Sequence, residues 1–589
     1  MKHTSNYDKY PCVSVPCPAD SGVAGWEEIA RQLNSASQES ARITVECYIG
    51  VDVEEIGRTL ETHLSPDVLL YSTEAMKTEA EVDALVAPFD GGDDPVFGHI
   101  SPLNMEDFFC CEKLTALKDK VSKAPGLVVI VGPGASLVHP GDVLAYADIA
   151  RWEAQMRMRR NEACNLGTSN YELKWSLQYK RAYFTDWRVC DRLKRSLWDR
   201  IDFLLDTNLP AQPKMVTGSA LRTGLAMTAR RPFRVVPFFD PAPWGGQWMK
   251  EACDLGRNES NFGWCFDCVP EENSLLLEFN GVSVEIPSIN LVFQEPVALL
   301  GPSIHERFGA EFPIRFDFLD TIDGGNLSLQ VHPKDEYIKD QFGMNYTQDE
   351  SYYILDADEN ATVFLGLSDE SDPVSLEADL NEAQRGGKPF DATHHTNEWP
   401  ACKHDHFLIP AGTIHCSGSG TMVLEISATP YIFTFKLWDW GRLGLDGKPR
   451  PINIDRGMKN IDWGRRRDWV EKNLVNNIQT VGRTSDYTEE RTGLHELEFI
   501  ETRRHWFTGP VSHHTGNTVN VLNLVEGAEA LVESPDDSFE PFTVHYAETF
   551  IVPASVGNYL IRPIGKSDGK TCATMKAHVR ENQLAEEIK

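Results

Sequence analysis

The sequence has no long hydrophobic run. None of its apolar stretches reaches the roughly 18 residues that a helix needs to cross a bilayer. The first residues, MKHTSNYDKYPCVSVPCPADSG, contain no apolar core of signal-peptide length. We therefore expect a cytoplasmic protein that has no membrane partner.

The chain has few basic residues relative to acidic ones, and its cysteines have no regular spacing. The chain has 56 Lys and Arg against 88 Asp and Glu, which gives a formal net charge of −32. Such a chain repels phosphate backbones, so we expect no nucleic-acid partner. The 13 cysteines are odd in number and follow no regular spacing. This pattern favours reduced thiols over a disulfide framework.

The length predicts several domains, because 589 residues exceed what one hydrophobic core usually supports. Residues 1–220 mix helical patterns with a few apolar strands, which indicates an α/β domain. Residues 225–470 and 485–589 contain short alternating strands separated by Gly, Pro, Asn and Asp, which predicts two antiparallel β domains. A polar, partly helical insert at 375–405 interrupts the first β domain and could cover its mouth.

One apolar strand in the α/β part runs into a glycine turn, GLVVIVGPGASLV. Strand, glycine turn and helix in this order build phosphate-binding loops. A loop of the GxxxxGK[ST] type also needs a lysine and a hydroxyl, but no lysine follows Gly132 and Gly134. Together with KRAYFTDWRVCDRLKRSLWDRIDFLLDTN, the segment resembles a nucleoside-kinase-like (P-loop-kinase-like) α/β domain whose catalytic lysine is missing. A degenerate kinase fold and a plain scaffold both fit.

Four polar residues occupy matched positions in the first β domain. Gln330 and His332 are two apart in NLSLQVHP, so on a strand they project from the same face. Glu350 opens the strand ESYYIL, and His415 follows a Pro-Ala-Gly turn in HFLIPAGTIHCSG. Two imidazoles, a carboxylate and an amide oxygen suit zinc or a similar divalent ion. The alternative is a set of satisfied polar residues that line a barrel.

In this region the sequence resembles the class I mannose-6-phosphate isomerases, zinc-dependent enzymes of the cupin (jelly-roll) superfamily. The family's LSxQVHPxDEYA appears as LSLQVHPKDEYI, and its IPAGTIHA appears as IPAGTIHC. VVPFFDPAPWGGQWMKE and FPIRFDFLDT are similar to two further strands of the family. The resemblance implies that Gln330, His332, Glu350 and His415 bind one zinc ion per chain, and that the substrate is a sugar phosphate.

The chain departs from the family where the family binds phosphate. Gln348 stands in place of a lysine just ahead of the metal glutamate, and Lys436 in place of an arginine of bacterial relatives. Lysine keeps the charge but loses the planar fork that holds an oxyanion through two bonds. Lys334 could supply the missing cation. We therefore expect Lys334 and Gln348 to bind substrate and Lys436 to be the catalytic group.

The C-terminal strands resemble a second copy of the first β domain. TFIVPASVGNYLI can be laid on HFLIPAGTIHCSG, which places Asn558 where His415 stands. His513 and His514 are adjacent, so on a strand they should face opposite ways. We predict a duplicated cupin whose second copy has no metal site. Within it, TVNVLNLVEGAEALVES predicts a hairpin with a glycine turn.

The resemblance implies an aldose-ketose isomerase that interconverts mannose 6-phosphate and fructose 6-phosphate. No single general base can be assigned from the sequence. A non-catalytic, metal-containing sugar-phosphate sensor stays open, because the cation expected at position 348 and the kinase lysine are both missing. An iron-dependent cupin oxygenase fits less well, because a set that includes glutamine does not match two histidines and one carboxylate.

Overall fold

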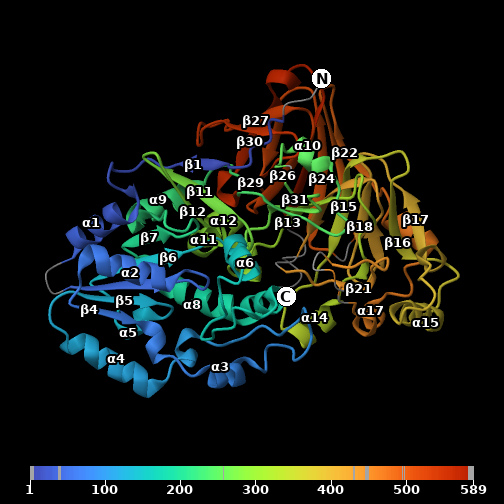
Figure 1. The fold of residues 1–589 in the computed structure, drawn as a ribbon. Helices are drawn as coiled ribbons and strands as arrows, with labels where there is room; N and C mark the ends of the chain where they lie inside the picture. The colour runs from blue at the N-terminus through green and yellow to red at the C-terminus, as the bar shows by residue number, and fades with distance from the viewer. Residues whose placement is uncertain are drawn as a thin grey trace. The chain divides into compact units, whose positions relative to one another are not determined.

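The chain separates into two compact units, many of whose elements are labelled in Figure 1. The β unit comprises Met1–Pro11, Ala229–Pro270 and Glu295–Lys589, and the α/β unit comprises Cys12–Thr228 and Glu271–Gln294. In the part of the chain that the structure describes, no helix is both long and apolar enough to span a membrane. All 13 cysteines lie in that part and are free. The computed structural model describes residues 5–37, 41–256, 258–428, 431–444, 447, 450, 452–493, 495 and 498–580.

A seven-stranded sheet forms the centre of the α/β unit, with the order β2-β8-β7-β6-β3-β5-β4. The five strands from β7 to β4 are parallel, and β8 and β2 add to one edge in antiparallel fashion. Strands covered on both faces need apolar residues on both, which explains why β5 reads VVIVG and is buried throughout. The predicted α/β architecture is confirmed. The strands are β2 (Gly22–Ala24), β3 (Arg42–Cys47), β4 (Val68–Tyr71), β5 (Val128–Gly132), β6 (Val143–Asp148), β7 (Phe203–Asp206) and β8 (Lys214–Thr217).

The direction in which the chain builds this sheet reverses at β3. From β3 the chain passes through α2 to the edge strand β4, returns to β5, and then crosses to β6 on the other side of β3. The loops after β3 and after its neighbours therefore lead in opposite directions at the carboxyl edge of the sheet, which leaves a crevice between them. The helices of the unit are α1 (Trp26–Ala36), α2 (Val53–Leu64), α3 (Glu79–Val86), α4 (Cys111–Lys123), α5 (Ala135–Val138), α6 (Arg151–Arg159), α7 (Trp175–Arg181), α8 (Trp187–Leu197), α9 (Gly218–Thr228) and α11 (Ile289–Gln294).

A segment from the middle of the chain completes the α/β unit. It forms the three-stranded sheet β1-β11-β12, whose strands are β1 (Cys12–Ser14), β11 (Ser274–Phe279) and β12 (Val282–Pro287). Buried Lys194 of α8 donates to both carboxylate oxygens of Asp148 and to Asn290 of α11, which ties the segment to the main sheet. The predicted boundary at 225 assigned this segment to the metal-binding domain, whereas the structure places Glu271–Gln294 in the α/β unit.

The first part of the β unit contains two antiparallel sheets, in the orders β18-β15-β20-β13-β10-β9 and β17-β16-β19-β14-β21. Their strands are β9 (Phe238–Asp240), β10 (Trp264–Cys268), β13 (Arg315–Asp320), β14 (Leu329–Val331), β15 (Glu350–Ala357), β16 (Thr362–Leu367), β17 (Thr396–Pro400), β18 (His406–Ile409), β19 (His415–Ser417), β20 (Thr421–Ser427) and β21 (Phe435–Trp438). The predicted helical insert is confirmed, because α15 (Pro373–Gln384) and α16 (Ala392–His395) lie between β16 and β17. The other helices here are α10 (Trp248–Ala252), α12 (Pro296–Leu300), α13 (Pro302–Phe308), α14 (Asp335–Phe342), α17 (Ile454–Asn460) and α18 (Arg467–Asn473).

The C-terminal part contains a second pair of antiparallel sheets, β22-β23-β24-β31-β26-β29 and β25-β30-β27-β28. The predicted hairpin is wrong, because β26 pairs with β29 and β31 while β27 pairs with β28 and β30. Gly527, with φ +99°, turns the chain from one sheet to the other. His513 is buried and His514 is exposed, as their adjacency predicts. The strands are β22 (Gln479–Arg483), β23 (Tyr487–Gly493), β24 (Ile500–Phe507), β25 (Val511–His514), β26 (Asn520–Glu526), β27 (Glu529–Glu533), β28 (Phe542–His545), β29 (Thr549–Val552), β30 (Asn558–Pro563) and β31 (Cys572–Val579).

Candidate metal centre

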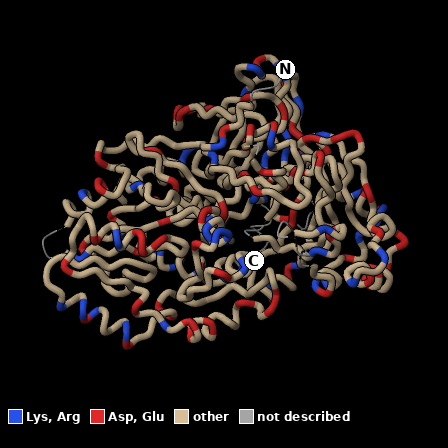
Figure 2. The backbone as a smooth tube through the Cα atoms, viewed as in Figure 1, with Lys and Arg blue, Asp and Glu red and all other residues tan. Residues whose placement is uncertain are grey.

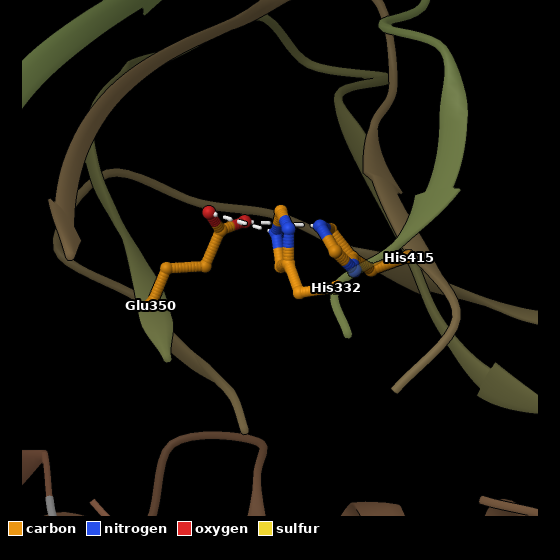
Figure 3. Close-up of side chains that lie close together, drawn as sticks. All are labelled: His332, Glu350 and His415. Carbon is orange, nitrogen blue, oxygen red and sulfur yellow. Dashed lines mark ion pairs between the residues drawn. The ribbon is translucent and has the colours of Figure 1, made fainter. Parts of the chain in front are cut away.

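Three of the four predicted metal ligands meet in the first pair of β sheets. His332 Nε2 lies 3.0 Å from Glu350 Oε2, and His415 Nε2 lies 2.9 Å from Glu350 Oε1. Figure 3 shows both imidazoles directed toward the Glu350 carboxylate. All three side chains are buried. They form a group of His and Glu whose ligand atoms lie within 4.8 Å of one another, the geometry that a metal ion needs.

The strand register brings the fourth predicted ligand to the same place. Gln330 in β14 pairs directly with His415 in β19 on one side and with Lys436 in β21 on the other. Residues directly opposite each other in antiparallel strands point to the same face of the sheet. Gln330 Nε2 accordingly lies 3.3 Å from His415 Nε2. A rotation about its last side-chain bond would exchange the amide nitrogen for the oxygen, the atom that binds metals.

A backbone carbonyl accepts a hydrogen bond from Nδ1 of each imidazole and so fixes the ring. His332 Nδ1 donates to Phe433 O at 2.9 Å, and His415 Nδ1 donates to Thr413 O at 2.8 Å. With its proton on Nδ1, each ring turns the lone pair of Nε2 toward Glu350. With both ring protons on Nδ1, no proton lies between either Nε2 and the Glu350 oxygen 3.0 or 2.9 Å away. Lone pairs that face a carboxylate repel it unless a cation or proton lies between them, so these residues fit a divalent ion.

The pKa shifts agree with a ligand set. Burial alone would raise the pKa of Glu350, but the two imidazoles outweigh burial and hold the pKa well below its usual range. Burial lowers the pKa of His415, which keeps this imidazole neutral. Burial also lowers the pKa of His332, but the Glu350 carboxylate outweighs it, and the net shift is upward. The Glu350 carboxylate thus stays anionic beside a neutral His415, while the raised pKa of His332 reflects its own contact with Glu350.

Gln348, a predicted substrate-binding residue, lies beside Glu350. Its Nε2 donates to Glu350 Oε2 at 2.9 Å, and its Oε1 accepts from Phe433 N at 3.0 Å. The side chain is 4% exposed. Both ends of the amide are thus bonded within the protein, and the Nε2 bond orients the Glu350 carboxylate.

The two predicted cations differ in their surroundings. Lys436 is partly buried, and burial lowers the pKa of Lys436 to about 7; Arg450 lowers it further and Asp439 opposes the shift. Lys334 is exposed at the start of α14, and its Nζ lies 3.4 Å from Ile461 O. The sheet register places Lys436 on the face of the sheet that carries Gln330 and His415, whereas Lys334 lies outside the paired strands.

Sequence reasoning missed Glu425, which lies in β20 opposite Tyr352 of β15. Burial raises the pKa of Glu425 well above its usual range, and Glu350 raises it further. Burial thus favours the neutral Glu425 carboxyl, the form that can donate to the Glu350 carboxylate. The sequence feature that could have identified it is that Glu425 is the single acid in the apolar strand TMVLEIS.

Comparisons with known proteins match different parts of the chain to different families. Residues 25–230 match a family model described as a domain of unknown function, DUF8485. The chain is 26% identical over 224 residues to a mannose-6-phosphate isomerase of Streptococcus mutans, a match that covers 38% of this chain and 65% of that protein. It is 24% identical over 338 residues to the mannose-6-phosphate isomerase ManA of Bacillus subtilis, covering 57% of this chain and 93% of the relative.

Solved structures of similarly named proteins also match. The mannose 6-phosphate isomerase of Bacillus subtilis has a TM-score of 0.48 at 18% identity, and the match covers 59% of this chain and 100% of that one. A putative mannosephosphate isomerase of Archaeoglobus fulgidus has a TM-score of 0.44 at 17% identity, covering 60% and 98%. The chain is thus similar in sequence, over part of its length, to curated mannose-6-phosphate isomerases.

Proposed function

We propose that the protein is a metal-dependent aldose-ketose isomerase that interconverts mannose 6-phosphate and fructose 6-phosphate. The observation that carries this proposal is the group of His332, Glu350 and His415, in which buried Nε2 atoms face one carboxylate. The group lies within the isomerase-like motifs of the sequence. The alignments with proteins named mannose-6-phosphate isomerase support the choice of substrate.

We propose zinc as the ion, one per chain, held by Gln330, His332, Glu350 and His415. Nitrogen and carboxylate ligands in this number suit zinc and leave room for substrate oxygens. When bound, the ion would act as a Lewis acid on the carbonyl and hydroxyl oxygens at C1 and C2 of the sugar. Gln348 and Glu425 would orient the ligand carboxylate, the usual role of groups behind a metal ligand.

Lys436 would stabilise the negative charge that develops as the proton leaves carbon. Its pairing with Gln330 directs the ammonium group to the face of the sheet that carries the ligands. The charged form is needed for this role, and with a pKa of about 7 roughly half of the lysine carries it at neutral pH. Lys334 remains a candidate for the phosphate group.

The remaining domains have proposed roles that do not involve this chemistry. We propose that the two β parts are a duplicated cupin and that the second copy shapes the protein without binding metal. In support, Asn558, at the position equivalent to His415, is exposed. We propose that the α/β unit is a degenerate kinase-like domain, which its parallel sheet with a reversal at β3 supports.

A coupled assay of fructose 6-phosphate formation from mannose 6-phosphate tests the proposal. We expect zinc-loaded protein to turn over with a kcat of roughly 1–10³ s⁻¹. The His415→Ala protein should lose this activity while keeping its circular dichroism spectrum. If zinc-loaded wild type shows no turnover above the blank but binds mannose 6-phosphate in calorimetry, the isomerase proposal fails and a sensor is the better description.

A further inference from the structure

The α/β unit contains a cavity of about 770 Å³ that the metal centre does not use. It lies at the carboxyl ends of the parallel strands, because its walls include Tyr48–Glu54 after β3, Tyr71 and Glu74 at the end of β4, and Pro133 after β5. Residues 162–168 form another part of the wall. Open α/β sheets bind ligands at this edge, where the direction of strand building reverses.

Carboxylates of the protein occupy two helix N-termini at this edge, those of α2 and α5. Asp52 caps α2 and accepts a hydrogen bond from Glu55 N at 2.8 Å. Glu46, at the end of β3, accepts from Gly134 N at 2.6 Å and from Ser136 N at 2.9 Å. Phosphate groups bind helix N-termini through these same N–H groups. A phosphate would have to displace a carboxylate at either place, so the cavity is poorly suited to nucleotides.

The charge of the cavity wall also disfavours anions. Five acids and two bases line it, a formal charge of −3, and they are Asp52, Glu54, Glu74, Glu79, Glu162, Arg58 and Lys77. Among these residues, Lys77 donates to Asp107 O at 2.5 Å, and Glu162 is paired with Arg160 at 2.8 Å. Acidic residues, red in Figure 2, are spread along the whole backbone. The surrounding field therefore attracts cations and repels phosphates.

Aromatic rings stand among these acids. Tyr71 packs closely over α2, since a Cβ on Gly57 would lie 2.2 Å from the Tyr71 hydroxyl. Tyr171 lines the same cavity and is 43% exposed. Tyrosine faces attract organic ammonium groups through cation–π contacts, and neighbouring carboxylates add ion pairs. Rings and carboxylates together select an organic cation rather than a bare metal ion.

We propose that this cavity binds a small organic polycation, an amine with at least two ammonium groups, and that it does not bind nucleotides. Its size accommodates a flexible chain whose ammonium groups pair with acids on different walls. The attraction is electrostatic in large part, so affinity falls as ionic strength rises.

Calorimetry on the full chain tests this proposal, with spermidine as the probe and ATP and inorganic phosphate as comparison ligands. We expect saturable binding of about one spermidine per chain and no binding of ATP or phosphate. Glu54→Gln and Glu74→Gln should each weaken spermidine binding by about two- to five-fold. Glu112→Gln is the matched control, because Glu112 is exposed in α4 and does not line the cavity.

Three results would overturn the proposal. They are the absence of saturable spermidine binding, affinities that stay unchanged in both Glu54→Gln and Glu74→Gln, and tighter binding of ATP than of spermidine. None of the substituted residues belongs to the metal centre, so isomerase activity should be the same in all variants.

Discussion

Replacing Gln348 by methionine is the sharpest test of the metal centre. Methionine has nearly the shape of glutamine but no amide, so Gln348→Met removes the bonds to Glu350 Oε2 and from Phe433 N. Loss of a partner behind a metal ligand typically lowers metal affinity 10- to 100-fold, which is about 1.4–2.8 kcal/mol. The buried Phe433 N–H left without an acceptor should cost a further ~1–3 kcal/mol of stability.

Two measurements separate these effects. Competition with a chromogenic chelator gives the zinc affinity, and thermal unfolding followed by circular dichroism gives the loss of stability. Gln348→Glu is the matched variant, because its carboxylate can still accept from Phe433 N but adds a negative charge beside Glu350 and donates nothing. If Gln348→Met binds zinc as tightly as wild type and only raises the KM for sugar phosphate, Gln348 contacts substrate and our reading of its role is wrong.

Three further predictions concern the proposed ligands and Lys436. Elemental analysis should find about one zinc per chain in wild type and in the control His514→Ala. His332→Ala and His415→Ala should each lose zinc. Full zinc occupancy in both of these variants would refute the assignment. Lys436→Ala should lower kcat by ~10²–10³ with zinc retained, and unchanged kcat would remove Lys436 from the site. Because the charged form is required, wild-type kcat should fall as pH rises through about 7, whereas in Lys436→Arg, whose guanidinium stays protonated, this fall should move to higher pH.

The grouping of the four proposed metal ligands could be predicted from the sequence because local rules bring them together. The two-residue period of a strand puts Gln330 and His332 on one face, and the turn before His415 delivers it at a strand start. The role of Gln348 could not be predicted in this way. Its amide is bonded to Phe433, which is 85 residues away in the chain and becomes a neighbour only in the folded sheet.

Strand partners show the same limit on a larger scale. The pattern of TVNVLNLVEGAEALVES correctly predicts two strands and a glycine turn, but β26 and β27 belong to different sheets. Alternation of apolar residues indicates which face of a strand is buried and leaves open which strand lies beside it. The segment Glu271–Gln294 was assigned to the wrong unit for the same reason, since its partner β1 lies more than 200 residues earlier in the chain.

Because Glu271–Gln294 belongs to the α/β unit, no single truncation of the chain separates the β unit from the α/β unit. The chain passes from one unit to the other after Pro11, Thr228, Pro270 and Gln294. A truncated protein that starts near residue 230 would keep β11 and β12 but lose the sheet they complete, and would expose Leu275, Leu277, Val284 and Ile286, which are buried in the full chain. Such a hairpin invites aggregation. A shortened protein would therefore need Glu271–Gln294 replaced by a brief polar loop. A protease cut in any one linker should leave both units held together, because at least one of the two fragments contributes to both.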